Sequence, residues 1–251
     1  MDSGGNAVQA VRADGLRDAP EAPGDTRERM LDVAERLFAA HGIEKVSVRE
    51  IVRESGQRNV SAAQYHFGSR DALIAALIER RIRVIDAMRH ARLDALLAAG
   101  EPGVRDLMLA SVRALAGAVR DRPWGPDFVR VSAQALASPQ VELARRLPRD
   151  ATRSLARVKR LIRPLLPQLP EAVFGERMRL VNHQGTYCVA DWVRLHGAVR
   201  PANAAAFDAM VRDTADFLAG GLAAPVGPPL DDDRPPGDDP PGRSGGRAGP
   251  H

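Results

Sequence analysis

Cysteine is almost absent from this chain of 251 residues, in which Cys188 is the only one. A single cysteine excludes a disulfide framework within the chain and a zinc site built on cysteines. The sequence also lacks an uncharged apolar run long enough to cross a membrane. Residues 1–24 have no apolar core of the kind found in secretory signals. We therefore expect a cytoplasmic protein that has no membrane partner.

Motifs of several common catalytic sites are missing as well. The chain contains no HExxH motif, no glycine loop that would cradle a phosphate and no clustered metal ligands. His183 and Cys188 are five residues apart in a predicted helix, so their side chains do not form a facing pair. We accordingly predict no catalytic residue, no metal site and no cofactor, and we do not expect an enzyme.

Aromatic residues make up only 4% of the chain, while alanine, leucine and arginine abound. This composition favours helices, and no segment shows the period-2 alternation of a strand. We therefore predict an all-α protein without a sheet. The net charge of +4 and the pI of about 9.9 permit a nucleic-acid partner without establishing one.

The two ends of the chain differ in composition from the middle. Residues 1–24 and 221–251 are rich in Pro, Gly and Asp and bury too little apolar area to offset the entropy of ordering. We predict a disordered arm and a disordered tail there, with a head at 25–70 and a larger domain at 71–220. Apolar periodicity and the positions of prolines predict helices at about 26–41, 48–55, 60–66, 70–98, 103–120, 127–137, 139–147, 149–165, 170–196 and 201–218.

Start signals are clearest in the head. Ser47 and Glu50 form a capping-box pattern, and Val46 and Ile51 stand at the two positions of a hydrophobic staple. Asn59 is the favoured N-cap of the next helix, with Ser61 as a competing cap. Glycine and serine at 68–69 then separate that short helix from a long one.

The first three predicted helices, one of normal length followed by two short ones, predict a helix-turn-helix, in which the third helix reads DNA. Ala63 and Phe67 are expected to anchor the reading helix to the core, which leaves Ser61, Gln64 and Tyr65 facing outward. Gln and Ser can hydrogen-bond base edges in the major groove. Residues 45–70 carry five basic and two acidic side chains, an excess that suits phosphates.

The same region resembles the DNA-binding head of TetR-family transcriptional regulators over about residues 26–80. The matching stretches are AERLFAAHG at 34–42, VSVREI at 46–51 and YHFGSRDAL at 65–73. The resemblance implies a homodimer, a double-stranded DNA operator and repression that a small-molecule effector relieves. One departure stands out: residues 57–58 occupy a turn in which the family usually has one small apolar residue.

Site residues follow from the resemblance and from the local charge. Ser47 and Arg70 are expected to contact phosphates, and Tyr65 and His66 the backbone or groove. Arg49 and Arg53 are equally interpreted as solvated charges or partners of nearby glutamates, and His66 as a packed structural residue. Arg58 in the longer turn is a candidate for an added phosphate contact. The full predicted DNA-binding set is Ser47, Arg49, Arg58, Asn59, Val60, Ser61, Ala62, Gln64, Tyr65, His66 and Arg70.

The region after residue 100 carries few family motifs. The resemblance places the dimer interface on the last two long helices, with apolar surface from Val173, Met178, Val181, Tyr187, Trp192, Phe207, Met210, Val211, Phe217 and Leu218. An effector pocket is mostly apolar with a few polar groups. Core packing is the competing interpretation for each residue of our candidate lining, which is Trp124, Phe128, Gln134, Met178, Asn182, His183 and Tyr187.

The sequence as a whole predicts a ligand-responsive DNA-binding repressor. Two other functions stay open at this stage. The longer turn is compatible with a helical sensor or scaffold whose DNA head is vestigial, and the sequence does not distinguish a repressor from an activator.

Overall fold

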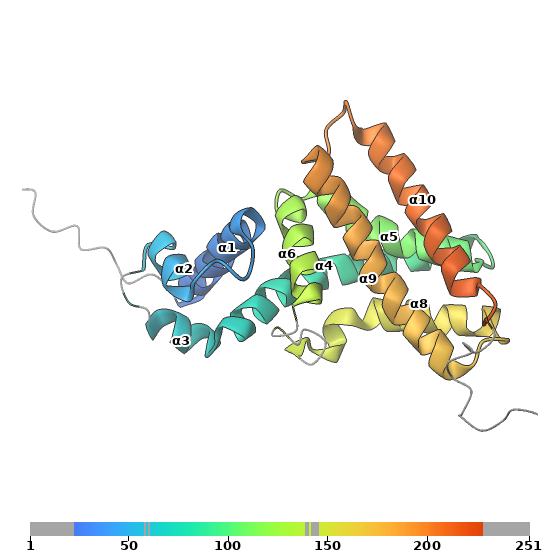
Figure 1. Ribbon diagram of the computed structural model, residues 1–251, viewed down its shortest axis with the longest axis horizontal. Helices are drawn as coiled ribbons and strands as arrows, with labels where there is room; N and C mark the ends of the chain where they lie inside the picture. Colours follow the sequence, from blue (N-terminus) through green and yellow to red (C-terminus); the bar gives the residue numbers. More distant parts are fainter. Residues whose placement is uncertain (1–22, 58, 60, 139–140, 142–145, 228–251) are drawn as a thin grey trace, which may run out of the picture.

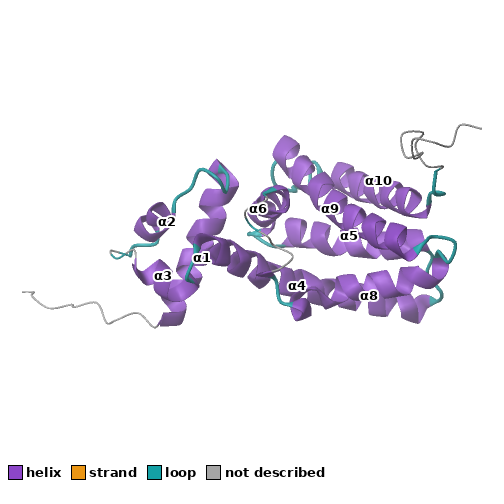
Figure 2. Cartoon of the chain, turned by 60° about the horizontal axis from the view of Figure 1, so that its bottom comes forward, coloured by secondary structure: helices purple, strands orange, loops and turns teal. Residues whose placement is uncertain are grey.

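The computed structural model describes residues 23–57, 59, 61–138, 141 and 146–227. Within these ranges the chain is helical and contains no strand, which confirms the all-α prediction (Figure 2). Most of the predicted terminal arm and tail, and most of the predicted helix at 139–147, lie outside the described residues.

The first three helices form the head (Figure 1). They are α1 (Pro23–His41), α2 (Val48–Glu54) and α3 (Ser61–Phe67). The body comprises α4 (Arg70–Ala99), α5 (Val104–Asp121), α6 (Gly125–Ala137), η1 (Arg149–Thr152), α8 (Arg153–Ile162), η2 (Arg163–Leu165), α9 (Glu171–His196) and α10 (Ala204–Ala223). Helix α4 extends from the head into the body in both views.

Two body helices differ from the sequence prediction. The single helix predicted at 149–165 is an α-helix with a short 3₁₀ turn at each end. Pro164 explains the second turn, because proline lacks the N–H that a continuing α-helix needs. The last helix begins at Ala204 instead of 201, since the Asn203 side chain accepts a hydrogen bond from the Arg200 amide at 2.7 Å and holds a turn there.

The predicted caps are present in the head. The Ser47 hydroxyl accepts from the Glu50 amide at 3.2 Å, and the Asn59 side chain accepts from the Ser61 amide at 2.9 Å. Val46 and Ile51, at the staple positions, are both buried. Each cap provides a partner for a helix N-terminal amide that has none within the helix. The start of the reading helix is therefore set by local chemistry.

One hydrophobic cluster, here called the head cluster, joins the head to the body. Its residues come from α1, α2, α3 and the first half of α4, and they continue into α5 and α6 through Ala114, Phe128 and Val131. The apolar packing therefore crosses the predicted boundary between residues 70 and 71. That boundary marks the end of a motif and not a break in the core.

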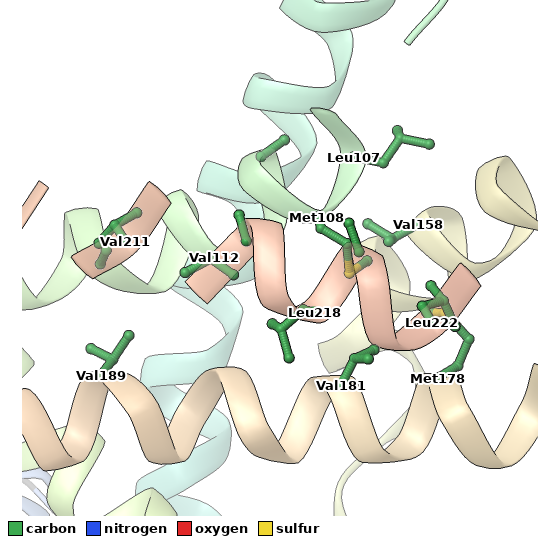
Figure 3. Packing of buried hydrophobic residues seen from close by; sticks show 14 of the residues in the cluster. Leu107, Met108, Val112, Val158, Met178, Val181, Val189, Val211, Leu218 and Leu222 are labelled. Carbon is green, nitrogen blue, oxygen red and sulfur yellow. The ribbon is translucent and has the colours of Figure 1, made fainter. Parts of the chain in front are cut away.

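A second hydrophobic cluster, here called the body cluster, forms the centre of the body. Met108 and Val112 of α5, Met178 and Val181 of α9, and Leu218 of α10 belong to it (Figure 3). The sequence prediction had assigned several apolar side chains of α9 and α10 to a dimer surface, and this is wrong for those buried within the protomer: Met178, Val181, Trp192, Phe207, Val211 and Leu218. These residues are needed for packing within the protomer: α9 packs against α5 and α6, α10 packs against α5, and the two helices pack against each other.

Ion pairs also tie the head to the body. Glu35 of α1 is almost fully buried and accepts from Arg81 of α4 at 2.6 Å. Arg80 of α4 forms ion pairs with Glu28 and Asp32 of α1, at 2.8 Å each. Burial raises the pKa of Glu35, although hydrogen bonding and charge from Arg81 oppose the rise. Removing either arginine would leave a buried carboxylate poorly paired.

Candidate nucleic-acid interface and ligand cavity

Helix α3 has one fixed face and one open face. Ala63 is buried and Phe67 is half-buried against the head cluster. On the other face Ser61, Gln64 and Tyr65 are exposed, and the exposed fraction of Tyr65 is 82%. The outward orientation predicted for these three residues is therefore present. A large aromatic ring left in water on a short helix is available to a partner.

His66 lies between the two faces. Its ring contacts Tyr65 edge-on, with centroids 5.1 Å apart, and lies 6.1 Å from the ring of Phe67. Arg27 of α1 lies over the Phe67 ring at 5.4 Å. His66 thus packs on both aromatic neighbours and is only partly accessible.

Basic side chains lie before α2, within α2 and at the start of α4. Lys45 and Arg49 are exposed, whereas Arg53 pairs with Glu54 at 3.3 Å. Arg70, at the start of α4, is half-buried and lies 5.8 Å from the centre of the Phe38 ring. Its guanidinium therefore makes a packing contact with α1.

Three more residues of the predicted DNA-binding set are among the described residues. Ser47 and Asn59 are exposed and Ala62 is half-buried. Arg58 and Val60 lie outside the described residues. Gly68 connects α3 to α4 with a φ of +72°, a conformation that side chains disfavour, and its amide donates to the Gln64 carbonyl at 2.9 Å. This C-terminal turn fixes where α3 ends relative to α4.

A cavity of about 280 Å³, here called the central cavity, lies in the body. Its walls come from α4, α5, α6, α8, α9 and α10, together with η1 and Leu147. The lining residues are Ile78, Ile82, Ile85, Arg89, Met108, Ser111, Val112, Leu115, Phe128, Ser132, Leu136, Leu147, Thr152, Leu155, Arg179, Val181, Asn182, His183, Gly185, Thr186 and Leu218.

Three of the seven residues predicted for an effector pocket, Phe128, Asn182 and His183, line the central cavity. The other four lie elsewhere. Trp124 packs edge-on against Phe128 and under the Arg81 guanidinium. Gln134 accepts from the Ile43 amide at 2.8 Å, Met178 is buried in the body cluster, and Tyr187 is half-buried on α9.

Sequence reasoning missed Arg89 and Ser132. Arg89 follows Ile78, Ile82 and Ile85 at helical spacing on α4, so a charged residue in an apolar stripe was the available signal. Ser132 gave no signal, because its position on the cavity side of α6 depends on packing against α9.

The ionisable side chains that line the central cavity, Arg89, Arg179 and His183, are all basic. Burial lowers the pKa of Arg89 to about 10, and Asp86 opposes this shift, so the guanidinium stays protonated at neutral pH. Burial and the charge of Arg179 lower the pKa of His183, against the opposing effect of Glu176. Among the described residues that line the cavity, none is an aspartate or glutamate.

A second cavity of about 260 Å³ is lined by α4, α5 and α10 residues that include Arg92 and Asp121. Within the described part of the chain, no group of three or more His, Cys, Asp or Glu residues is arranged to hold a metal ion. None of the described helices is long and apolar enough to span a membrane.

Comparisons with solved structures place the fold. A TetR-family protein from Shewanella sp. PV-4 is 20% identical, with 77% of this chain and 95% of that chain covered and a TM-score of 0.55. The fatty acid degradation regulator FadR from Bacillus halodurans is 17% identical, with 78% and 96% covered and a TM-score of 0.52. A transcriptional-regulator structure from Saccharomonospora viridis in complex with choline is 19% identical, with 78% and 96% covered and a TM-score of 0.50.

No curated protein matches the chain. Two family models do match it. Residues 30–77 match the bacterial regulatory proteins of the tetR family, which covers the helix-turn-helix described above. Residues 109–221 match the tetracyclin repressor-like C-terminal domain, which covers most of the cavity walls. With both parts in the order that the fold requires, the chain belongs to the TetR family of DNA-binding transcriptional regulators.

Proposed function

We propose that this regulator is a homodimeric repressor that binds a palindromic operator and leaves it when a small molecule enters the central cavity. The observation that carries the proposal is the exposed polar face of α3, whose opposite face is fixed to the head cluster. The Gln64 amide and the Ser61 hydroxyl have the chemistry to hydrogen-bond base edges in a major groove. Tyr65 supplies a flat apolar surface beside them.

The surrounding side chains have a positioning role in this proposal. Charged and hydroxyl groups on the phosphate backbone fix the register of a reading helix without specifying sequence. We assign that role to Ser47, Arg49, Asn59, His66 and Arg70, and extend it to Arg58, while Ala62 and Val60 are assigned to the groove.

Exposed apolar side chains on the last two helices support a dimer. Leu180 and Leu195 on α9 are 49% and 59% exposed, and Phe217 on α10 is 68% exposed. Large apolar side chains left in water favour association, because a partner removes their surface from water. A two-fold symmetric pairing of these helices would present two α3 helices about 34–36 Å apart, which is one turn of DNA.

Helix α6 supplies the link between cavity and head. It contributes Phe128 and Ser132 to the cavity wall, and from another face its Gln134 holds the Ile43 amide at the end of α1. Ser138 adds a hydrogen bond to Glu44 at 3.0 Å. A ligand that shifts α6 therefore shifts the segment between α1 and α2, and it releases DNA if it favours the shifted state.

Selection of bound sites from random DNA, followed by gel shifts over a salt series, tests the proposal. We expect one palindromic site and a log–log salt slope of about −0.9 per phosphate neutralised. Binding without preference for any palindrome would contradict it and would favour a helical sensor with a vestigial head. A reporter gene placed behind the selected site shows whether the protein represses or activates transcription. Lower expression in the presence of the protein indicates a repressor, and higher expression indicates an activator.

A further inference from the structure

The central cavity offers a ligand an apolar wall of defined size. Ile78, Ile82 and Ile85 face it from α4, and Phe128 and Leu136 from α6. At about 30 Å³ per water-sized group in a liquid, 280 Å³ holds about nine such groups. This is slightly below the usual range of about 300–1,000 Å³ for ligand pockets. The ligand that fits is small and largely apolar.

The same cavity contains two buried donors that lack a partner. Arg89 is 8% exposed, and one of its terminal nitrogens donates to the Ser154 hydroxyl at 2.8 Å. Its Nε is buried without a hydrogen-bond partner, and so is the hydroxyl oxygen of Ser132, which is 6% exposed. A buried polar group left unpaired carries an uncompensated desolvation cost. An acceptor brought in by a ligand would recover that cost.

The nearest carboxylate is already engaged. Asp86 accepts from the Ser154 amide at 2.8 Å and from the Ser154 hydroxyl at 2.5 Å, and it is not part of the cavity wall. Arg179 and His183 add basic groups to that wall. A buried cation that faces an apolar space favours an anionic group placed beside it.

From these observations we propose that the central cavity binds a small amphiphilic monocarboxylate, with its carboxylate against Arg89 and its apolar part against the three isoleucines. Ser132 donates a second hydrogen bond to the bound acid. The inference rests on the proposed function, because it names the chemical class of the effector for that same cavity.

Calorimetric titration of the full chain with three eight-carbon probes tests the inference. Octanoate, 1-octanol and octylamine share an apolar chain and differ in their end group. We expect octanoate to bind at least about tenfold more tightly than 1-octanol, since a charge-assisted hydrogen bond is worth about 1.5–3 kcal/mol. Octylamine is expected not to bind. Equal affinities for octanoate and 1-octanol would overturn the inference.

Variants locate the carboxylate. Arg89→Met should weaken octanoate binding about tenfold or more and leave 1-octanol binding unchanged. Arg92→Met is the matched control, because Arg92 is on the same helix and lines the second cavity. If Arg89→Met fails to fold, Ser132→Ala is the deciding variant, because the Ser132 hydroxyl has no hydrogen-bond partner in the protein to lose. This variant should weaken octanoate binding by about fivefold and leave 1-octanol binding unchanged. Wild-type affinity for octanoate in the deciding variant would refute the assignment.

A gel shift with the selected operator separates this inference from the proposed function. If octanoate binds with the expected variant pattern and the operator complex persists, the ligand class stands and ligand-induced release is wrong. If a molecule without a carboxylate dissociates the complex while octanoate does not bind, release stands and the ligand class is wrong.

Discussion

Gln64 and Tyr65 in the head and Arg89 and Ser132 in the body are all polar side chains on helices, and they differ in their access to water. The first two are exposed, whereas the second two are more than nine-tenths buried. An exposed polar group exchanges water for a partner at little cost, but a buried one without a partner carries its desolvation cost at all times. The surface of the head is therefore satisfied without DNA, while Arg89 Nε and the Ser132 hydroxyl have no hydrogen-bond partner among the described protein groups.

The largest expected effect breaks the head and leaves the body intact. Gln64→Ala combined with Tyr65→Ala should weaken specific operator binding by on the order of 100-fold, because each good base contact is worth about 1–3 kcal/mol. Both side chains are exposed, so we expect an unchanged thermal midpoint and an unchanged oligomeric state. Gel shifts and circular dichroism measure the two outcomes.

Glu54→Ala is a control for this double variant, since Glu54 is exposed on α2 and pairs only with its neighbour Arg53 among the described ion pairs. Operator affinity that survives the double substitution would remove these two side chains from the proposed interface.

The two regions also differ in how well the sequence predicted them. The head could be predicted because its signals are local. Ser47 caps α2 by accepting from the amide of Glu50, three residues later, and Gly68 ends α3 by donating its amide to the Gln64 carbonyl, four residues earlier. The central cavity is assembled from helices up to 140 residues apart, from Ile78 to Leu218. No local pattern specifies which faces of those helices meet, so the sequence predicts Gln134 in the pocket although it binds the Ile43 amide, and it does not indicate Ser132.

Gln134→Met should loosen the contact between the two regions. The change keeps the side-chain length and leaves the buried Ile43 amide without its acceptor, at a cost of about 1–3 kcal/mol. We expect the Ile43 amide to exchange hydrogen for deuterium about tenfold faster or more. Ala133→Ser, at the adjacent position on α6, serves as a control. Unchanged protection at Ile43 would show that the Gln134 hydrogen bond does not hold the head.

Arg70→Ala should have a smaller effect that is uniform across DNA sequences. Removing one phosphate contact lowers the salt slope by about 1 and weakens all complexes by a similar factor, about fivefold at moderate salt. Arg70 also packs on Phe38, so Arg70→Lys restores the charge without the planar stacking surface. A changed sequence preference in Arg70→Ala would assign the residue to base reading.

The smallest effect concerns the pH dependence of the cavity wall. Burial and Arg179 hold the pKa of His183 below its ordinary 6.5 in the folded protein, so the unfolded chain takes up a proton first as the pH falls. The neutral His183 therefore contributes stability at neutral pH. This stability is lost progressively as the pH falls below 6.5, until the pH has passed the pKa of His183 in the folded protein. His183→Gln should reduce the fall of the thermal midpoint between pH 7.5 and 5.5 by less than about 2 °C, because the side chain is only partly shielded. His41→Gln, at an exposed position on α1, should leave that slope unchanged. An identical slope in His183→Gln and the wild type would mean that the cavity wall accommodates the imidazolium as readily as water does.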